Sequence, residues 1–400
     1  MKKYLILAAA ALTAMAACSK VETIDNSSPV AINFSVVNHL QQTKATAGLT
    51  YPTTVPFGTF AWWTENDWTG IAADQTFVFM DNEQVVYRVL DETSAYAWAP
   101  ATAYYWTKSG KITFASYSPY TADGTDKGYS VVPSYDVAKG FLFNNYTIVS
   151  DTNIDLMYAN LAANCNRNTN SDGTLVTDNS NPEGGFSGVP TIFNHALCQV
   201  GFEFRAIGNK NPNVNAIKIE ITDVDMLNID NKGTFTQIPE VATTEKWATD
   251  HANFTASYDY APANEFVLDL IEKDATTAAA TDNYTALDKT RILLPQTLLV
   301  SKDATDVPLD IAAASTTDQK LVVAYTIKTE YKSALGTWAE ENVVSIIRLN
   351  NGNITAWKDN QNITYRISIN PNANIPVTFD PAVLSWTDVY SDDITIYTND

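Results

Sequence analysis

Residues 31–37 read AINFSVV, and this short stretch decides how the chain begins to fold. The apolar residues Ile32, Phe34 and Val36 alternate with smaller or polar residues. Successive side chains of a β-strand point to opposite faces, so a repeat of two residues places these three side chains on one face. The stretch therefore predicts a strand with one buried face.

The same repeat continues through most of the chain, with turn residues between the runs. The runs are VPFGTFAWW (55–63), TFVFM (76–80), QVVYRVL (84–90), KITFASYSPY (111–120), CQVGFEFRA (198–206), AIKIEITDVDML (216–227), RILLPQTLLV (291–300), KLVVAYTIKTEY (320–331), VVSIIRL (343–349), ITYRISI (363–369) and DITIYT (393–398). An apolar repeat of 3.6 residues is hardly ever sustained. We therefore predict an all-β protein.

A polar tract at residues 166–188 divides the series of strands. It reads NRNTNSDGTLVTDNSNPEGGFSG and contains hardly any apolar residues, which is typical of a junction or a long exposed loop. The chain has 400 residues, too many for one ordinary hydrophobic core. We predict two antiparallel β-sandwich domains in tandem, at residues 45–188 and 189–400.

The N-terminus has the features of an export signal. Lys2 and Lys3 precede an apolar run, and small residues follow up to Ala17, so residues 1–17 are expected to be removed. The run is too short to remain as a membrane-spanning helix. Met15-Ala16-Ala17-Cys18 has the form of a bacterial lipobox, which predicts that the Cys18 thiol carries a lipid. Ordinary secretion with a chance cysteine at the cleavage site is the alternative.

The charge of the chain excludes one class of partner. The formal net charge is -20, and removal of residues 1–17 takes away two lysines and no acid, which gives -22. A surface this acidic repels phosphate backbones, so we expect no nucleic acid partner. Two cysteines remain after Cys18, namely Cys165 and Cys198. They either form one disulfide or remain as two thiols.

Sequence motifs for catalysis or metal binding are weak. His39, His195 and His251 lie far apart and have no zinc-ligand spacing. Residues 168–173 read NTNSDG and resemble the start of a calcium loop, but Asn179 stands where such a loop needs a glutamate. Acidic pairs such as Asp223 and Asp225 are read as solvated surface charge. We expect no enzymatic activity, no cofactor and no metal.

Three tryptophans suggest an alternative function. Trp62, Trp63 and Trp68 lie close together, and the two neighbours in one strand point to opposite faces. An exposed indole ring could stack on a sugar ring, which would suit a surface glycan-binding lipoprotein. Core packing is the favoured interpretation, because tryptophan is usually buried.

Several stretches, in their order along the chain, resemble the fimbrillin-like lipoproteins of Bacteroidales. They are AYYWTKSGKITFASYSPY (103–120), TNIDLMYA (152–159), GVPTIFNHALCQVGFEF (188–204), RILLPQTL (291–298), ITYRISI (363–369) and VLSWTD (383–388). This resemblance covers nearly all of the chain after the lipobox. It implies two transthyretin-like β-sandwich domains and a structural or accessory role in a type V pilus that supports adhesion.

The resemblance also implies a sequence of maturation steps. The precursor would be a lipid-anchored protein of the outer membrane, and an Arg- or Lys-specific protease would remove its first strand. Residues 18–44 would then be the removed segment, with Ile32, Phe34 and Val36 as its apolar face. Lys44, in the triplet TKA, is the best processing candidate, with cleavage before Ala45; an ordinary solvated lysine is an equally open interpretation.

A strand from another subunit would then fill the groove that the first strand leaves, so the mature form would lie in the pilus at the cell surface. The C-terminal segment is the natural donor, with Ile394, Ile396 and Thr398 on one face. It is equally open that this segment is a resident edge strand of the second domain. Expected partners are other pilus subunits, the maturation protease, and a host or bacterial glycan or protein. A lipoprotein hydrolase is the least favoured function.

Overall fold

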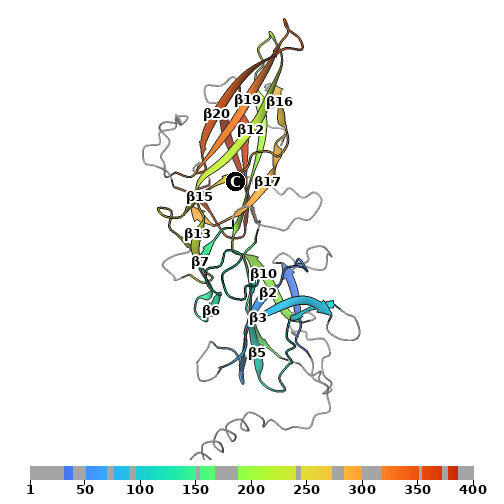
Figure 1. Ribbon diagram of the computed structural model, residues 1–400, viewed down its shortest axis with the longest axis vertical. Helices are drawn as coiled ribbons and strands as arrows, with labels where there is room; N and C mark the ends of the chain where they lie inside the picture. The colour runs from blue at the N-terminus through green and yellow to red at the C-terminus, as the bar shows by residue number, and fades with distance from the viewer. Residues whose placement is uncertain are drawn as a thin grey trace, which may run out of the picture.

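The computed structural model describes residues 31–38, 51–69, 76–89, 96–149, 154–166, 188–239, 245–272, 283–299, 318–350, 354–371 and 377–385. Within these ranges the regular secondary structure consists of strands, β1 to β23, so the all-β prediction is confirmed. The strands form two large sheets at opposite ends of an elongated molecule, with a smaller sheet between them (Figure 1).

The first sheet has eight strands in the order β2-β3-β4-β1-β10-β8-β5-β9. These are β1 (Phe34–Asn38), β2 (Phe57–Thr64), β3 (Thr76–Val89), β4 (Tyr96–Pro100), β5 (Lys111–Ser118), β8 (Met157–Ala159), β9 (Ala162–Cys165) and β10 (Val189–His195). An additional pairing of β2 with β5 closes this sheet on itself. The closed sheet surrounds the first hydrophobic core, which includes Ile32, Phe34, Phe57 and Phe114.

The second sheet has nine strands and follows the path β20-β19-β12-β16-β11-β22-β23, with β15 beside β12 and β17 beside β11. These are β11 (Cys198–Gly208), β12 (Val214–Asp230), β15 (Thr255–Asp259), β16 (Phe266–Glu272), β17 (Thr285–Leu293), β19 (Lys320–Tyr331), β20 (Trp338–Arg348), β22 (Gln361–Ile369) and β23 (Val377–Ser385). The inward side chains of β11, β12, β19 and β22 supply most of the second hydrophobic core. Two very short strands, β18 (Gln296–Thr297) and β21 (Ala356–Trp357), pair with each other.

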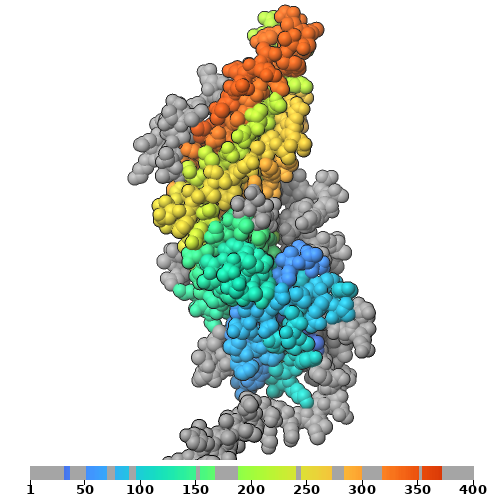
Figure 2. Space-filling model, viewed as in Figure 1, coloured from blue at the N-terminus to red at the C-terminus, as the bar shows by residue number. Residues whose placement is uncertain are grey.

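A four-stranded sheet joins the two ends of the molecule. It contains β6 (Ser134–Asp136), β7 (Gly140–Thr147), β13 (Lys232–Thr236) and β14 (Trp247–Thr249), in the order β14-β13-β7-β6. β7 comes from the first half of the chain and β13 from the second, and they pair antiparallel. A third hydrophobic core packs beneath this sheet, where the Phe143 and Phe235 rings stack with centroids 5.3 Å apart. In Figure 2 the blue-green residues around β6 and β7 lie against the yellow-green to yellow residues around β13 and β14.

The structure corrects three details of the predicted architecture. β10 belongs to the first sheet, so the change of sheet falls between His195 and Cys198 and not at residues 188 and 189. Most of the described strand pairs are antiparallel as predicted, but β1 is parallel to β10 and β11 is parallel to both β16 and β22. Parallel partners need long connections, which a strand pattern alone does not reveal. The two halves also share a sheet, in which β7 pairs with β13, and the strand pattern did not predict this pairing.

Candidate functional site: the first strand and its seat

The first strand is buried as its sequence predicts. Ile32 and Phe34 are 1% and 3% exposed, and Val36 packs against the same core with partial exposure. The Phe34 ring meets the rings of Phe57 and Phe114 edge to face, with centroids 5.5 and 5.6 Å away. Such pairs add to the hydrophobic effect of burial. Strand β1 is therefore a structural part of the first core.

The backbone of β1 is held mainly on one side. It pairs parallel with β10 at five positions, from Phe34 opposite Val189 to Asn38 opposite Phe193. On its other side it pairs with β4 at Phe34 opposite Trp98. Just before the strand, the Ile32 N–H donates to the Tyr104 carbonyl at 2.8 Å. Strand β1 thus fills a slot that is one strand wide between β4 and β10.

A glycine lets β1 approach its partner closely. Gly188, directly before β10, has φ of +131°, a conformation that other residues rarely adopt. A Cβ atom at this position would lie 3.0 Å from the Phe34 carbonyl carbon and from the Ser35 nitrogen. The Val189 N–H donates to the Asn33 carbonyl at 2.9 Å beside it. The glycine at the end of the polar tract therefore forms part of the seat of β1.

The other residues predicted for maturation fall outside the described ranges. These are Cys18, the cleavage pair Lys44 and Ala45, and the C-terminal residues Ile394, Ile396 and Thr398. The first described residue after Ala45 is Tyr51, which is 1% exposed and packs in the first core. Its hydroxyl shares a 2.6 Å hydrogen bond with Ser118. Strand β23, the last described strand, ends at Ser385.

The predicted tryptophan cluster is packed into the molecule. Trp62 is 7% exposed and belongs to the third core, whereas Trp63 packs against the first core, on the opposite face as the strand repeat predicts. The Trp62 ring lies against Trp68 and Tyr135, with centroids 5.6 and 5.3 Å away. The Trp63 indole N–H donates to the Ser109 carbonyl at 2.9 Å. The buried Trp62 ring therefore has little surface left on which a sugar could stack.

The cysteines and the described histidines sit in structural positions. Cys165 and Cys198 are free thiols, buried on β9 and β11, and burial raises the pKa of each well above its usual value. A buried thiol with a raised pKa is a poor nucleophile at neutral pH. His195 Nδ1 lies 2.7 Å from Asp155, and His251 pairs with the buried Asp230. Each described histidine thus contacts a carboxylate, and the two pairs come from different parts of the chain.

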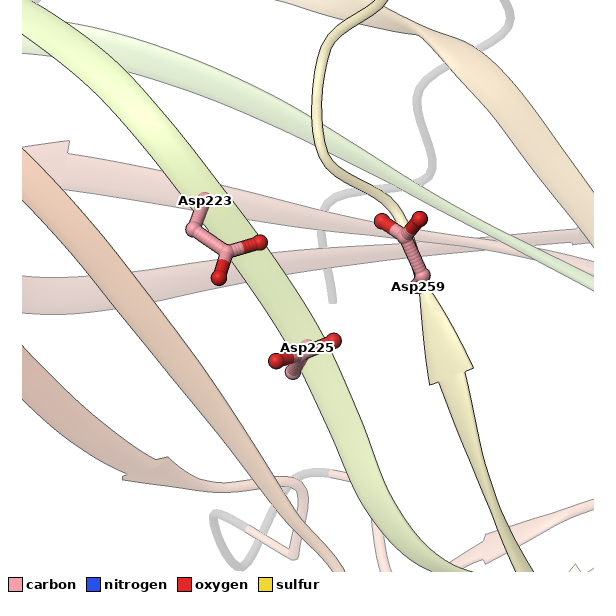
Figure 3. A group of neighbouring side chains, drawn as sticks. All are labelled: Asp223, Asp225 and Asp259. Atoms are coloured by element: carbon pink, nitrogen blue, oxygen red, sulfur yellow. The ribbon is translucent and has the colours of Figure 1, made fainter.

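Three aspartates gather at the surface of the second sheet. Asp223 and Asp225 lie on β12 and Asp259 ends β15, so that one oxygen of each lies within 4.8 Å of the others (Figure 3). Partial burial raises the pKa of Asp225, and the neighbouring charges of Asp223 and Asp259 raise it further. Lys289 Nζ lies 3.7 Å from the Asp259 carboxylate and offsets part of this charge. Exposed acidic groups of this kind do not by themselves define a metal site.

A pocket of about 320 Å³ lies at the junction, lined in part by Lys246, Trp357 and Asp359. The Lys246 ammonium donates to Asp359 Oδ2 at 2.7 Å and to the Tyr158 hydroxyl at 2.8 Å. The charged groups of Lys246 and Asp359 in this pocket therefore already bind each other. Among the described residues, no helix is long and apolar enough to cross a membrane.

The described residues thus form an elongated all-β molecule with a first strand set into a closed sheet. Comparison with known proteins agrees. A crystal structure of a fimbrial protein from Bacteroides vulgatus matches with a TM-score of 0.53 and 20% identity, over 89% of this chain and 99% of that one.

The chain belongs to the fimbrillin-like family, whose model matches residues 43–386. Weaker structural matches are a cell-adhesion candidate from Bacteroides uniformis and a tip fimbrial protein from Porphyromonas gingivalis. The first has a TM-score of 0.42 and 13% identity over 92% of this chain and 100% of that chain. The second has a TM-score of 0.28 and 10% identity over 83% and 94%. The chain matches no curated protein sequence significantly.

Proposed function

We propose that this protein is a structural or accessory subunit of a type V pilus, which loses β1 by proteolysis and assembles by β-strand exchange. The observation that carries the proposal is the position of β1 between β4 and β10. Its inward side chains fill the first core, yet the family model begins at Thr43 and leaves this strand out. Lys44 directly follows the start of the matched region.

Loss of β1 would leave a groove suited to another strand. The inward side chains of Ile32 and Phe34 would leave an apolar cavity, and the facing edges of β4 and β10 would keep unpaired N–H and C=O groups. An extended segment can supply both missing features at once, by β-augmentation. Because the groove and the donor lie on different parts of the subunit, such a contact repeats as a filament.

Cleavage after Lys44 would separate the removed strand from a firmly held remainder. Tyr51 is anchored in the first core by its ring contacts with Trp98 and Phe193, at 5.2 and 5.1 Å. Cutting upstream of this anchor would leave the mature N-terminus attached near the groove. Lipid on Cys18 would leave together with the strand, so it would hold the precursor at the outer membrane only until assembly.

The C-terminal segment is the proposed donor. Ile394, Ile396 and Thr398 follow β23, which ends the described path of the second sheet at one edge. A segment that leaves an edge strand can reach a neighbouring molecule without disturbing the interior of its own sheet. The role is structural and non-enzymatic, and the packing of Trp62 and Trp63 gives the glycan-binding alternative no support.

The test is intact-mass analysis and N-terminal sequencing of the protein from surface pili, together with limited trypsin treatment of the recombinant precursor. We expect Ala45 at the mature N-terminus, and polymer growth by light scattering only after cleavage. Lys44→Gln should block both steps, whereas Lys44→Arg should preserve both because an Arg/Lys-specific protease accepts either residue. A lipidated Cys18 that persists on an inert monomer would refute the proposal.

A further inference from the structure

An exposed apolar surface continues from the first core beyond the position of β1. Tyr87 and Val89 on β3, and Tyr96 on β4, are 40%, 36% and 62% exposed. We call these three residues the aromatic ledge. The rings of Tyr87 and Tyr96 stack with centroids 5.5 Å apart at an angle of 26°.

The aromatic ledge lies on the inward face of the first sheet. In the β3–β4 register, Tyr87 is opposite Trp98 and Val89 is opposite Tyr96. Directly opposite residues point to the same face, and Trp98 belongs to the first core. The Tyr87 ring also lies 5.4 Å from the Trp98 ring. The ledge is therefore an outward continuation of the apolar lining that receives β1.

Strand β1 forms only part of the backbone pairing that the edge of β4 offers. Within the described residues β1 meets β4 at a single register position, Phe34 opposite Trp98, although it follows β10 for five. Extending the antiparallel register by two residues would set position 36 opposite Tyr96. Val36 supplies a small side chain at that position, and Tyr96 remains the most exposed of the ledge residues. The edge of β4 and the aromatic ledge thus offer more contact than β1 takes up.

We propose that the aromatic ledge is the surface that selects and retains the incoming strand of a second subunit. This inference rests on the proposed function. The strand runs parallel to β10 and antiparallel to β4, and it pairs with β4 toward Tyr96 more fully than β1 does. Its apolar side chains cover Tyr87, Val89 and Tyr96, so the exchanged strand buries more aromatic surface than the strand it replaces. The ledge is continuous with the β1 slot, and among the described residues β1 pairs with the β4 edge at one position only; both features favour an extended strand, and not a compact partner, as the occupant.

The experiment measures polymer growth of trypsin-cleaved protein for the wild type, Tyr96→Ser, and the double variant Tyr87→Ser/Tyr96→Ser. Tyr331→Ser is the matched control, because Tyr331 is 44% exposed on β19 in the other sheet. We expect the critical concentration for polymerisation to rise about tenfold or more in the double variant, less in Tyr96→Ser, and not at all in Tyr331→Ser. Tyr96→Ser changes the most exposed ledge residue and guards against misfolding of the double variant. Hydrogen exchange of the β4 backbone should become slower on polymerisation.

The outcomes separate the two proposals. Wild-type protein that is cut at Lys44 and does not polymerise would overturn the proposed function and, with it, the occupant of the ledge. Normal polymerisation of both folded ledge variants would overturn the ledge inference and leave the proposed function standing. Binding of an oligosaccharide that the ledge variants lose while polymerising normally would make the ledge a sugar-binding surface, which also overturns the inference.

Discussion

Strands β1 and β23 are the first and last described strands, and they occupy opposite kinds of position. Strand β1 lies between two neighbours and completes a sheet that closes on itself, whereas β23 pairs with β22 alone and ends the path of the second sheet. Loss of β1 would open the first core, where Ile32 and Phe34 are buried, and would leave two facing strands, β4 and β10, whereas loss of β23 would expose one edge, that of β22. Loss of β1, the strand proposed for removal, would therefore leave a groove between two strands that another strand can fill.

Deleting each strand tests this comparison most directly. We expect removal of residues 31–38 to cost more than about 5 kcal/mol in the free energy of unfolding of the first sheet, because Ile32 and Phe34 leave a cavity. That is comparable to the whole stability of many domains. Truncation after Pro371, which removes β23, should cost less, because β22 still pairs with β11. Urea unfolding and binding of a hydrophobic dye measure both effects, and an equal or larger loss on removal of β23 would reverse the comparison.

A single substitution in β1 sharpens the comparison. Phe34→Ala should lower the free energy of unfolding by about 3–5 kcal/mol, because Phe34 is 3% exposed and contacts two aromatic rings. Val36→Ala is the matched change on the same face, and its partial exposure limits the expected loss to about 1 kcal/mol. Denaturant titration decides; similar losses at the two positions would show that β1 is not seated as described.

The seat of β1 is tested by Gly188→Ala. The new Cβ would strain the backbone and press on β1, with an expected cost of about 1–3 kcal/mol. Gly336→Ala is the control, because Gly336 has φ of +82° but a Cβ added there would meet no atom within 4 Å, so it measures backbone strain alone. Thermal unfolding should show the larger loss at Gly188. After cleavage, the Gly188 variant should also release β1 faster.

The smallest expected effect concerns the junction between the sheets. Burial alone would lower the pKa of Lys246, whose side chain is 28% exposed, but its hydrogen bonds and charge interactions with Asp359 and Tyr158 together outweigh burial and raise the pKa above its usual value. A raised folded-state pKa stabilises below the unfolded pKa, and that contribution disappears as the pH rises through the folded value. Lys246→Gln should therefore cost about 1 kcal/mol at pH 7–9, with the difference shrinking above about pH 10.5. Unfolding of both proteins across this range measures it, and a difference that stays constant to higher pH would contradict the assignment.

The sequence predicted the local features of the fold better than the long-range ones. The alternation in AINFSVV correctly placed Ile32 and Phe34 in a core, because a strand's faces follow from neighbouring residues alone. The parallel pairing of β1 with β10 depends on residues about 150 positions further along the chain, and no local pattern encodes it. The sheet shared by β7 and β13 was missed for the same reason.

The candidate site shows the same limit. A strand repeat signals a buried face, but it does not say which neighbours will pair with the strand or how completely. Exposed tryptophans were considered as a binding surface, whereas the exposed rings that stack beside the β1 slot are those of Tyr87 and Tyr96. The strand repeat in QVVYRVL, at residues 84–90, could have pointed to Tyr87, because it places Tyr87 on the same face as Val85, which is fully buried.

The pairing of β7 with β13 has a mechanical consequence. Tension applied at the two ends of the molecule passes through the backbone between β10 and β11 and also through a sheet made by both halves, where the Phe143 and Phe235 rings stack. The load is then shared among several backbone hydrogen bonds and a packed core, and it does not fall on a single flexible linker. A chain built of such subunits would resist bending within each subunit, and its compliance would lie at the contacts between them.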